Sequence, residues 1–209
     1  MKLSLSERQL FGKLYSHLMQ FGWEKSRYKA RGQHDQEAFI AIRDSLFQNR
    51  RLLTTFVTRN PFDFSPEELE IVSNWKQAHC GWFYIVRDTK DYTVFVECRK
   101  EYEPSGDIFG VVALDKPFKK IVQTPLPVLV RTVLLPFRGR IIFDGAMTFH
   151  SVDLGDDVRQ TLDGVCDYKS RTSGVITSLE VKHERNLGTQ SKTLAKRKVP
   201  THTKKPKSK

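Results

Sequence analysis

The stretch CGWFYIVRDTKDYTVFVEC, residues 80–98, decides the fold class. Two runs rich in aromatic and β-branched residues, 82–89 and 92–98, flank the dipeptide Lys90-Asp91. Such runs are typical of strands, and a connection this short predicts a hairpin, although without a glycine it does not fix the type of turn. We therefore expect two antiparallel strands at the centre of the chain.

Further strands are expected on the C-terminal side of this hairpin. The candidate segments are residues 107–115, 127–137 and 140–152, and turn residues such as Pro104 and Gly139 separate them. Short strands broken by regular turn signals predict an antiparallel sheet or a small, partly open barrel. A short helix at 156–169 and a last strand at 175–179 would complete this part.

The chain before residue 79 has helical spacing instead. A first apolar stripe contains Phe11, Leu14, Tyr15, Leu18 and Met19, and Ser4 with Glu7 has the form of a capping box. A second stripe contains Phe39, Ile42, Leu46, Leu53 and Phe56, and ends at Asn60-Pro61. We expect two helices here.

A third helix is expected from a clear start signal. Ser65 is the predicted cap, Pro66 occupies the first helical position, and Glu68 can complete the capping box. Leu69, Val72 and Trp75 would then face the core. The predicted fold class is α+β, with a helical part at 1–79 and a β-rich part of the same core at 80–180.

The segment 181–209 has a different composition and is predicted to be a disordered tail. The last eighteen residues contain no acid and eight basic residues, namely Lys192, Lys196, Arg197, Lys198, Lys204, Lys205, Lys207 and Lys209. Without them, 27 basic residues face 24 acidic ones, so most of the net charge of +11 belongs to this segment. Such a segment binds polyanions through counterion release and without reading sequence, or it acts only as a solubilising tail.

Several classes of protein are excluded by what the sequence lacks. Lys2, Glu7, Arg8 and Lys13 interrupt the first twenty residues, and no apolar run is long enough to cross a bilayer, so we expect a cytoplasmic protein with no membrane partner. The three cysteines are far apart, which fits neither a disulfide framework nor a zinc site. Phosphate-loop, dinucleotide and hydrolase motifs are absent, so no cofactor and no catalytic residue is predicted.

The strongest candidate for a site lies in residues 135–157. Arg140, Ile142 and Asp144 would share one side of a strand, and with Arg138 they could form an anion site. The alternative is structural: Arg138-Gly139 and Asp144-Gly145 are turn residues, and Asp156-Asp157 cap the following helix. His150 lies near Asp153, but its spacing matches no standard set of metal ligands.

A second basic stretch, residues 23–36, interleaves Lys25, Arg27, Lys29 and Arg31 with aromatic residues. Basic groups among aromatic rings can hold a nucleic-acid strand. A solvated loop between the first two helices has the same composition. Arg43, Arg50 and Arg51 would add to a positive surface or line the wet face of the second helix.

Three segments carry a resemblance to a known family. Residues 69–96, 109–122 and 126–145 resemble a family of uncharacterised prokaryotic proteins with no established activity. The resemblance covers the body without the Lys-rich segment. It implies a complete folded unit and assigns no functional residue.

Two functions remain open. The first is a non-catalytic adaptor whose body recognises a protein partner, while the basic tail supplies affinity for nucleic acid or a ribonucleoprotein. The second is a small enzyme or anion-binding protein that uses Arg138, Arg140 and Asp144, which requires these side chains to converge in a concave, partly desolvated site.

Overall fold

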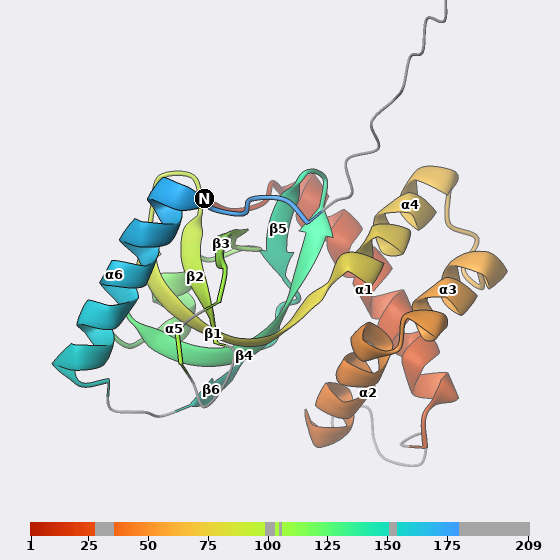
Figure 1. Ribbon diagram of the computed structural model, residues 1–209. Coiled ribbons are helices and arrows are strands. Elements are labelled where there is room, and N and C mark those ends of the chain that lie inside the picture. Colours follow the sequence, from red (N-terminus) through yellow and green to blue (C-terminus); the bar gives the residue numbers. More distant parts are fainter. Residues whose placement is uncertain (28–35, 99–102, 105, 151–153, 180–209) are drawn as a thin grey trace, which may run out of the picture.

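The computed structural model describes residues 1–27, 36–98, 103–104, 106–150 and 154–179, and the predicted tail at 181–209 lies outside them. The described chain forms an α+β fold, as predicted (Figure 1). Its elements are α1 (Leu5–Lys25), α2 (Gln36–Gln48), α3 (Arg50–Arg59), α4 (Pro66–Asn74), β1 (His79–Asp88), β2 (Thr93–Cys98), β3 (Ile108–Val112), α5 (Phe118–Val122), β4 (Val128–Phe137), β5 (Arg140–Phe143), β6 (Thr148–His150) and α6 (Asp156–Thr172).

Five of the strands close into a barrel. The antiparallel pairs are β1–β2, β2–β3, β4–β5 and β1–β4, and a parallel β3–β5 pair completes the circle. The expected antiparallel sheet is therefore mixed, because β3 and β5 run in the same direction. This strand order, with α5 between β3 and β4, is the topology of the OB fold, a five-stranded Greek-key barrel. β6 extends the sheet beside β4.

The strand β1 closes the barrel because it pairs on both sides. Its residues 82–88 pair with β2 and its residues 79–85 pair with β4. The register to β2 shifts between Ile85 and Arg87, and a bulge of this kind bends a strand. The hairpin predicted from residues 82–98 is confirmed, and the bulge gives β1 the curvature that a small barrel needs.

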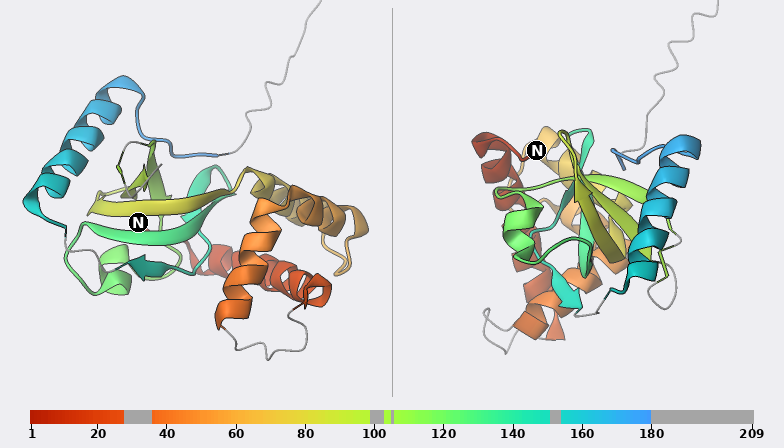
Figure 2. Two further views of the ribbon diagram at one scale, coloured as in Figure 1. Left: turned by 60° about the horizontal axis from the view of Figure 1, so that its bottom comes forward. Right: turned by 90° about the vertical axis from the view of Figure 1, so that its left-hand side faces the viewer.

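Three apolar clusters fill the molecule, and strand alternation separates them. Phe83, Phe95 and Phe109 point into the barrel, where Phe118 of α5 packs on them and closes the interior. The opposite side of β4 and β5 packs on α1–α4. The outer side of β1–β3 packs on α6 through Leu162. The four N-terminal helices and α6 thus cover opposite sides of the barrel (Figures 1 and 2).

Both ends of the described chain lie against β3. Lys2 forms a bridge with Ala113, and Ile176 forms a parallel bridge with Phe109. The Ile176 N–H donates to the Ile108 carbonyl at 2.9 Å, and the Gly110 N–H donates to the Ile176 carbonyl at 2.8 Å. The last strand expected at 175–179 therefore joins the sheet, although only as this single bridge.

The helices α1 and α4 begin where the sequence predicted. Capping boxes are present at Ser4 with Glu7 and at Ser65 with Glu68. The second predicted helix is wrong in one respect, because the chain breaks after α2. Asn49 caps α3 there by accepting from the Arg51 N–H at 3.1 Å, so one expected helix is two.

The helix α6 also differs from its prediction. It has 17 residues, which is more than the short helix expected at 156–169. Its cap is Gly155, and Asp156 and Asp157 occupy its first turn, where carboxylates favour the positive end of the helix dipole. Among the described helices, none combines the length and apolar character that crossing a bilayer requires.

Candidate functional site

The helix-facing side of β5 carries the polar residues that the sequence singled out. Arg140, Ile142 and Asp144 share this side, as predicted: Arg140 pairs with Glu7 of α1, and Ile142 belongs to the apolar cluster beneath the helices. Asp144 lies deeper, against α1 and α2. This side of the strand is where the barrel and the N-terminal helices meet.

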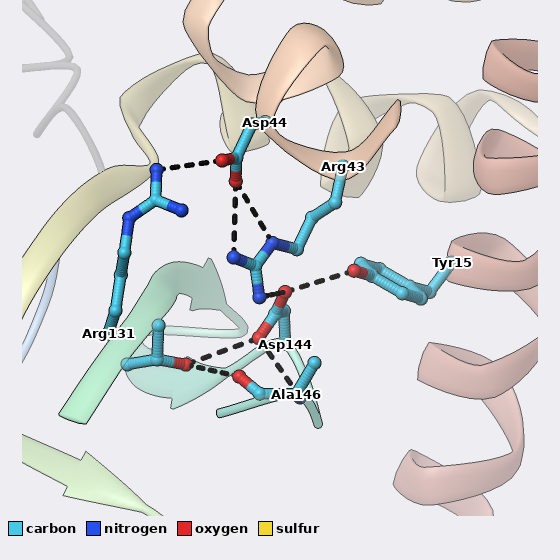
Figure 3. A network of polar contacts seen from close by, with 7 residues as sticks. Tyr15, Arg43, Asp44, Arg131, Asp144 and Ala146 are labelled. Atoms are coloured by element: carbon cyan, nitrogen blue, oxygen red, sulfur yellow. Dashed lines mark hydrogen bonds and ion pairs between the residues drawn. The ribbon is translucent and has the colours of Figure 1, made fainter. Parts of the chain in front are cut away.

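Asp144 is the buried centre of a polar network (Figure 3). The Tyr15 hydroxyl donates to Oδ2 of Asp144 at 3.1 Å, and the Thr132 hydroxyl and the Ala146 N–H each lie 3.2 Å from Oδ1. The Arg43 guanidinium lies 3.6 Å from Oδ2. Every one of these contacts comes from a different segment of the chain, so Asp144 joins the barrel to α1 and α2.

Arg43 links this centre to the surface. Its Nε and one terminal nitrogen donate to Oδ1 of Asp44 at 3.2 and 3.1 Å, and Arg131 of β4 donates to the other oxygen of Asp44 at 2.7 Å. Only 1 % of the Arg43 side chain is exposed. The expectation that Arg43 lies on a positive surface or a wet helix face is therefore wrong, because carboxylates on both sides compensate its buried charge.

Burial dominates the protonation of the network. It raises the pKa of Asp144 above the ordinary value of 3.8, while the Arg43 charge and the three hydrogen bonds act in the opposite direction. Burial and the Asp144 charge together raise the pKa of the Tyr15 hydroxyl well above 10.0. The phenol therefore keeps its proton, which it donates to Oδ2 of Asp144.

The predicted anion site at Arg138, Arg140 and Asp144 does not gather around one hollow in the described structure. Arg140 is engaged by Glu7 and Asp144 by Arg43 and Tyr15. Arg138 is exposed in the β4–β5 turn, where its φ is 49°. The turn chemistry proposed for Arg138-Gly139 matches the tight connection between β4 and β5.

His79, His150 and the three cysteines lie among other side chains of the body. His150 packs edge-on to Trp82, and His79 lies 2.8 Å from a carboxylate oxygen of Glu97. The three cysteines are free, and burial raises the pKa of Cys80 to about 11 and that of Cys98 to about 12. In the described ranges no group of three or more His, Cys, Asp or Glu side chains could hold a metal ion.

A shallow hollow of about 320 Å³ lies between the two tight turns at one end of the barrel. Asp91 and Tyr92 of the β1–β2 turn, Gly110 of β3 and Arg140 after the β4–β5 turn line it, and so does Thr177. The sequence did not predict this hollow. The signal that could have found it is a tyrosine directly after a hairpin turn, but only the barrel brings Tyr92 next to Gly110.

The remaining candidate residues fall partly or wholly outside the described chain. The eight basic residues at 192–209 lie outside it, as do Lys29 and Arg31. Lys25 and Arg27 are described and line a second hollow, of about 450 Å³, between the end of α1 and the helices α2 and α3.

Comparison of the chain with protein-family models, with curated proteins and with solved structures yields no significant match. The resemblance noted for residues 69–145 therefore stays a prediction. The OB topology rests on the strand pairing alone, and a fold of this kind hosts many functions, so it does not by itself assign one.

Proposed function

We propose that the protein is a non-catalytic binding module that holds nucleic acid, free or within a ribonucleoprotein, through the basic segment at its C-terminus. The observation that carries the proposal is the segregation of charge, with eight basic residues and no acid in the last eighteen positions. Lysine and arginine side chains on such a segment displace counterions from phosphates and bind without reading sequence.

The charges of the body support this division of labour. Arg8, Lys13, Arg43, Arg131, Arg140 and Lys169 all form ion pairs with carboxylates of the body. These cations serve the fold, so their contribution to a phosphate-binding surface is small. The body is then free to recognise a partner through its shape, while the basic segment supplies the affinity.

The alternative, a small enzyme or anion-binding protein centred on Arg138, Arg140 and Asp144, has less support. It requires unsatisfied charges that converge on a substrate. Arg140 and Asp144 instead have partners in the helices, and only 3 % of Asp144 is exposed.

The proposal predicts the salt dependence of binding. If four to six basic residues contact phosphates, log K for a generic DNA duplex should fall with log salt with a slope of about −4 to −5. Truncation after residue 191 should flatten the slope, whereas Arg138→Ala, which removes one exposed charge of the body, should change it by about one unit at most. Fluorescence anisotropy with two unrelated duplex sequences measures both the slope and the indifference to sequence.

The result that contradicts the proposal is equally direct. Full-length protein without salt-dependent affinity for DNA or RNA at about 50 mM salt would leave the basic segment as a solubilising tail.

A further inference from the structure

The hollow at the end of the barrel has a preformed aromatic side chain. The Thr89 hydroxyl donates to the Tyr92 carbonyl at 2.6 Å and accepts from the Tyr92 N–H at 3.1 Å, which fixes the backbone of the β1–β2 turn. Tyr92 is half-buried and lines the hollow. A ring held in this way loses little entropy when a ligand packs on it.

Gly110 creates the space for this ring. A Cβ atom at Gly110 would lie 2.8 Å from Cγ of Tyr92 and 3.0 Å from both Cδ atoms, so the ring lies across the bare backbone of β3. Two residues earlier on the same side of β3, Ile108 is covered by the cluster beneath α6. The strand is therefore covered by α6 at one end and by Tyr92 next to it, where the hollow opens.

Charged side chains lie at two places around the hollow, on its rim and in its lining. Each turn that frames it carries an exposed cation next to a lining residue: Lys90 precedes Asp91, and Arg138 precedes Gly139. The lining itself holds the Asp91 carboxylate and the Arg140 cation, which is already paired with Glu7. Phosphates are thus favoured at the rim, whereas a ring with hydrogen-bond donors is favoured inside.

The described chain ends close to the same hollow. Thr177 lines it, and the described chain ends two residues later at Leu179, with residues 180–209 still to follow. The basic residues at 192–209 follow in the same chain, so a nucleic-acid strand that they bind is tethered to the hollow and has a raised effective concentration there.

We propose that this hollow binds an unpaired base of single-stranded nucleic acid, with Tyr92 as the stacking surface, Asp91 as an acceptor for the base edge, and Lys90 and Arg138 as phosphate contacts at the rim. The inference rests on the proposed function and names its substrate class. Aromatic stacking is open to every base because each presents a flat π face, and a base inside a duplex does not present it. The basic segment then gives affinity, and the hollow gives a preference for single strands.

The test compares three full-length proteins, which are the wild type, Tyr92→Ala and Tyr92→Phe, with a truncated form that ends at residue 191. The probes are a labelled twelve-nucleotide single strand, as DNA and as RNA, and a duplex of matched charge, at two salt concentrations. Tyr92→Ala should weaken single-strand binding by about 5- to 150-fold and leave duplex affinity and the salt slope unchanged. Tyr92→Phe keeps the ring and should bind as wild type does.

The outcomes separate this inference from the proposed function. Unchanged single-strand affinity in a folded Tyr92→Ala variant, with binding lost in the truncated form, would overturn the base site and leave the proposed function standing. A backbone amide spectrum in which Gly110 and Tyr92 do not shift when the single strand is added would also overturn it. Absence of binding to any probe by the wild type contradicts both. Shifts at these two residues with DNA, RNA or both support the site and show which sugar it accepts.

Discussion

Arg43 and Asp144 show at the residue scale how the barrel and the helices are held together. Both are almost fully buried, with 1 % and 3 % exposed. Removing two charges from water is costly, and hydrogen bonds from neighbouring groups must offset that cost. Here Tyr15 and Thr132 donate to Asp144, while Asp44 accepts from Arg43. The network therefore fixes one arrangement of the two layers, and its members depend on one another.

This dependence predicts a strong coupling between the two buried charges. Arg43→Met leaves the buried Asp144 carboxylate without its cation and should cost about 3–5 kcal/mol of unfolding free energy, whereas Asp144→Asn leaves Arg43 paired with Asp44 and should cost less. The double variant removes both charges and should cost clearly less than the sum. Urea denaturation measures the cycle, with exposed Arg138→Met expected to stay within about 0.5 kcal/mol of wild type. Additive costs would show that the pair does not act as a unit.

The side of the strand on which Asp144 lies could be predicted from the sequence, whereas the burial of Arg43 could not. Alternation along a strand is local, so it showed that Arg140, Ile142 and Asp144 share a side. The burial of Arg43 is not a local property, because one of its two compensating carboxylates, that of Asp144, lies just after β5. An arginine is ordinarily exposed, and only the folded chain shows that this one is paired.

At the scale of elements, the junction between α4 and β1 is the best test of packing. Trp75 is fully buried, and its ring packs edge-on against Phe11 and Tyr15 of α1. Trp75→Ala should therefore cost about 3–5 kcal/mol through the cavity that it leaves. Thermal and urea unfolding measure the loss, and Tyr168→Ala on α6, where the residue is 66 % exposed, is the matched control. Wild-type stability in the Trp75 variant would contradict the packing described here.

Helix starts, the hairpin and the strand segments could be predicted because their signals are local: capping residues, a two-residue turn and alternating apolar positions. The break at Asn49 was missed because the apolar stripe continues across it at helical spacing. The parallel β3–β5 pair was missed because no local pattern encodes which strands become neighbours. The hollow at Tyr92 depends on that same closure, so the sequence could not predict it either.

At the scale of the whole molecule, the charged residues of the barrel lie in two different surroundings. The helix-facing side of β5 is occupied by ion pairs that hold α1 and α2. Lys90 and Arg138 stand exposed on the two turns that frame the hollow, which Thr177 also lines. The buried charges of the body thus serve its own assembly, and the exposed cations at the hollow are the ones that the proposed binding function uses.

The capping box at the start of α1, together with the ion pair between Glu7 and Arg140, should make the fold sensitive to acid. Hydrogen bonds from Ser4, mainly from its backbone N–H, outweigh burial and with Arg140 lower the pKa of Glu7 from 4.5 to about 2. As the pH falls from about 4.5 to about 2, the unfolded chain takes up a proton that folded Glu7 refuses, so this contribution to stability is present at neutral pH and is lost over that window.

Glu7→Gln should therefore lower the melting temperature at pH 7 but leave a flatter decline between about pH 4.5 and 2 than wild type shows. Circular dichroism melts over this range measure both effects. Glu70→Gln removes an exposed carboxyl of α4 and should leave the wild-type profile in place. If Glu7→Gln and wild type lose stability in parallel below pH 4.5, acid acts by protonating other groups. The contact between α1 and β5 then does not depend on the Glu7 charge.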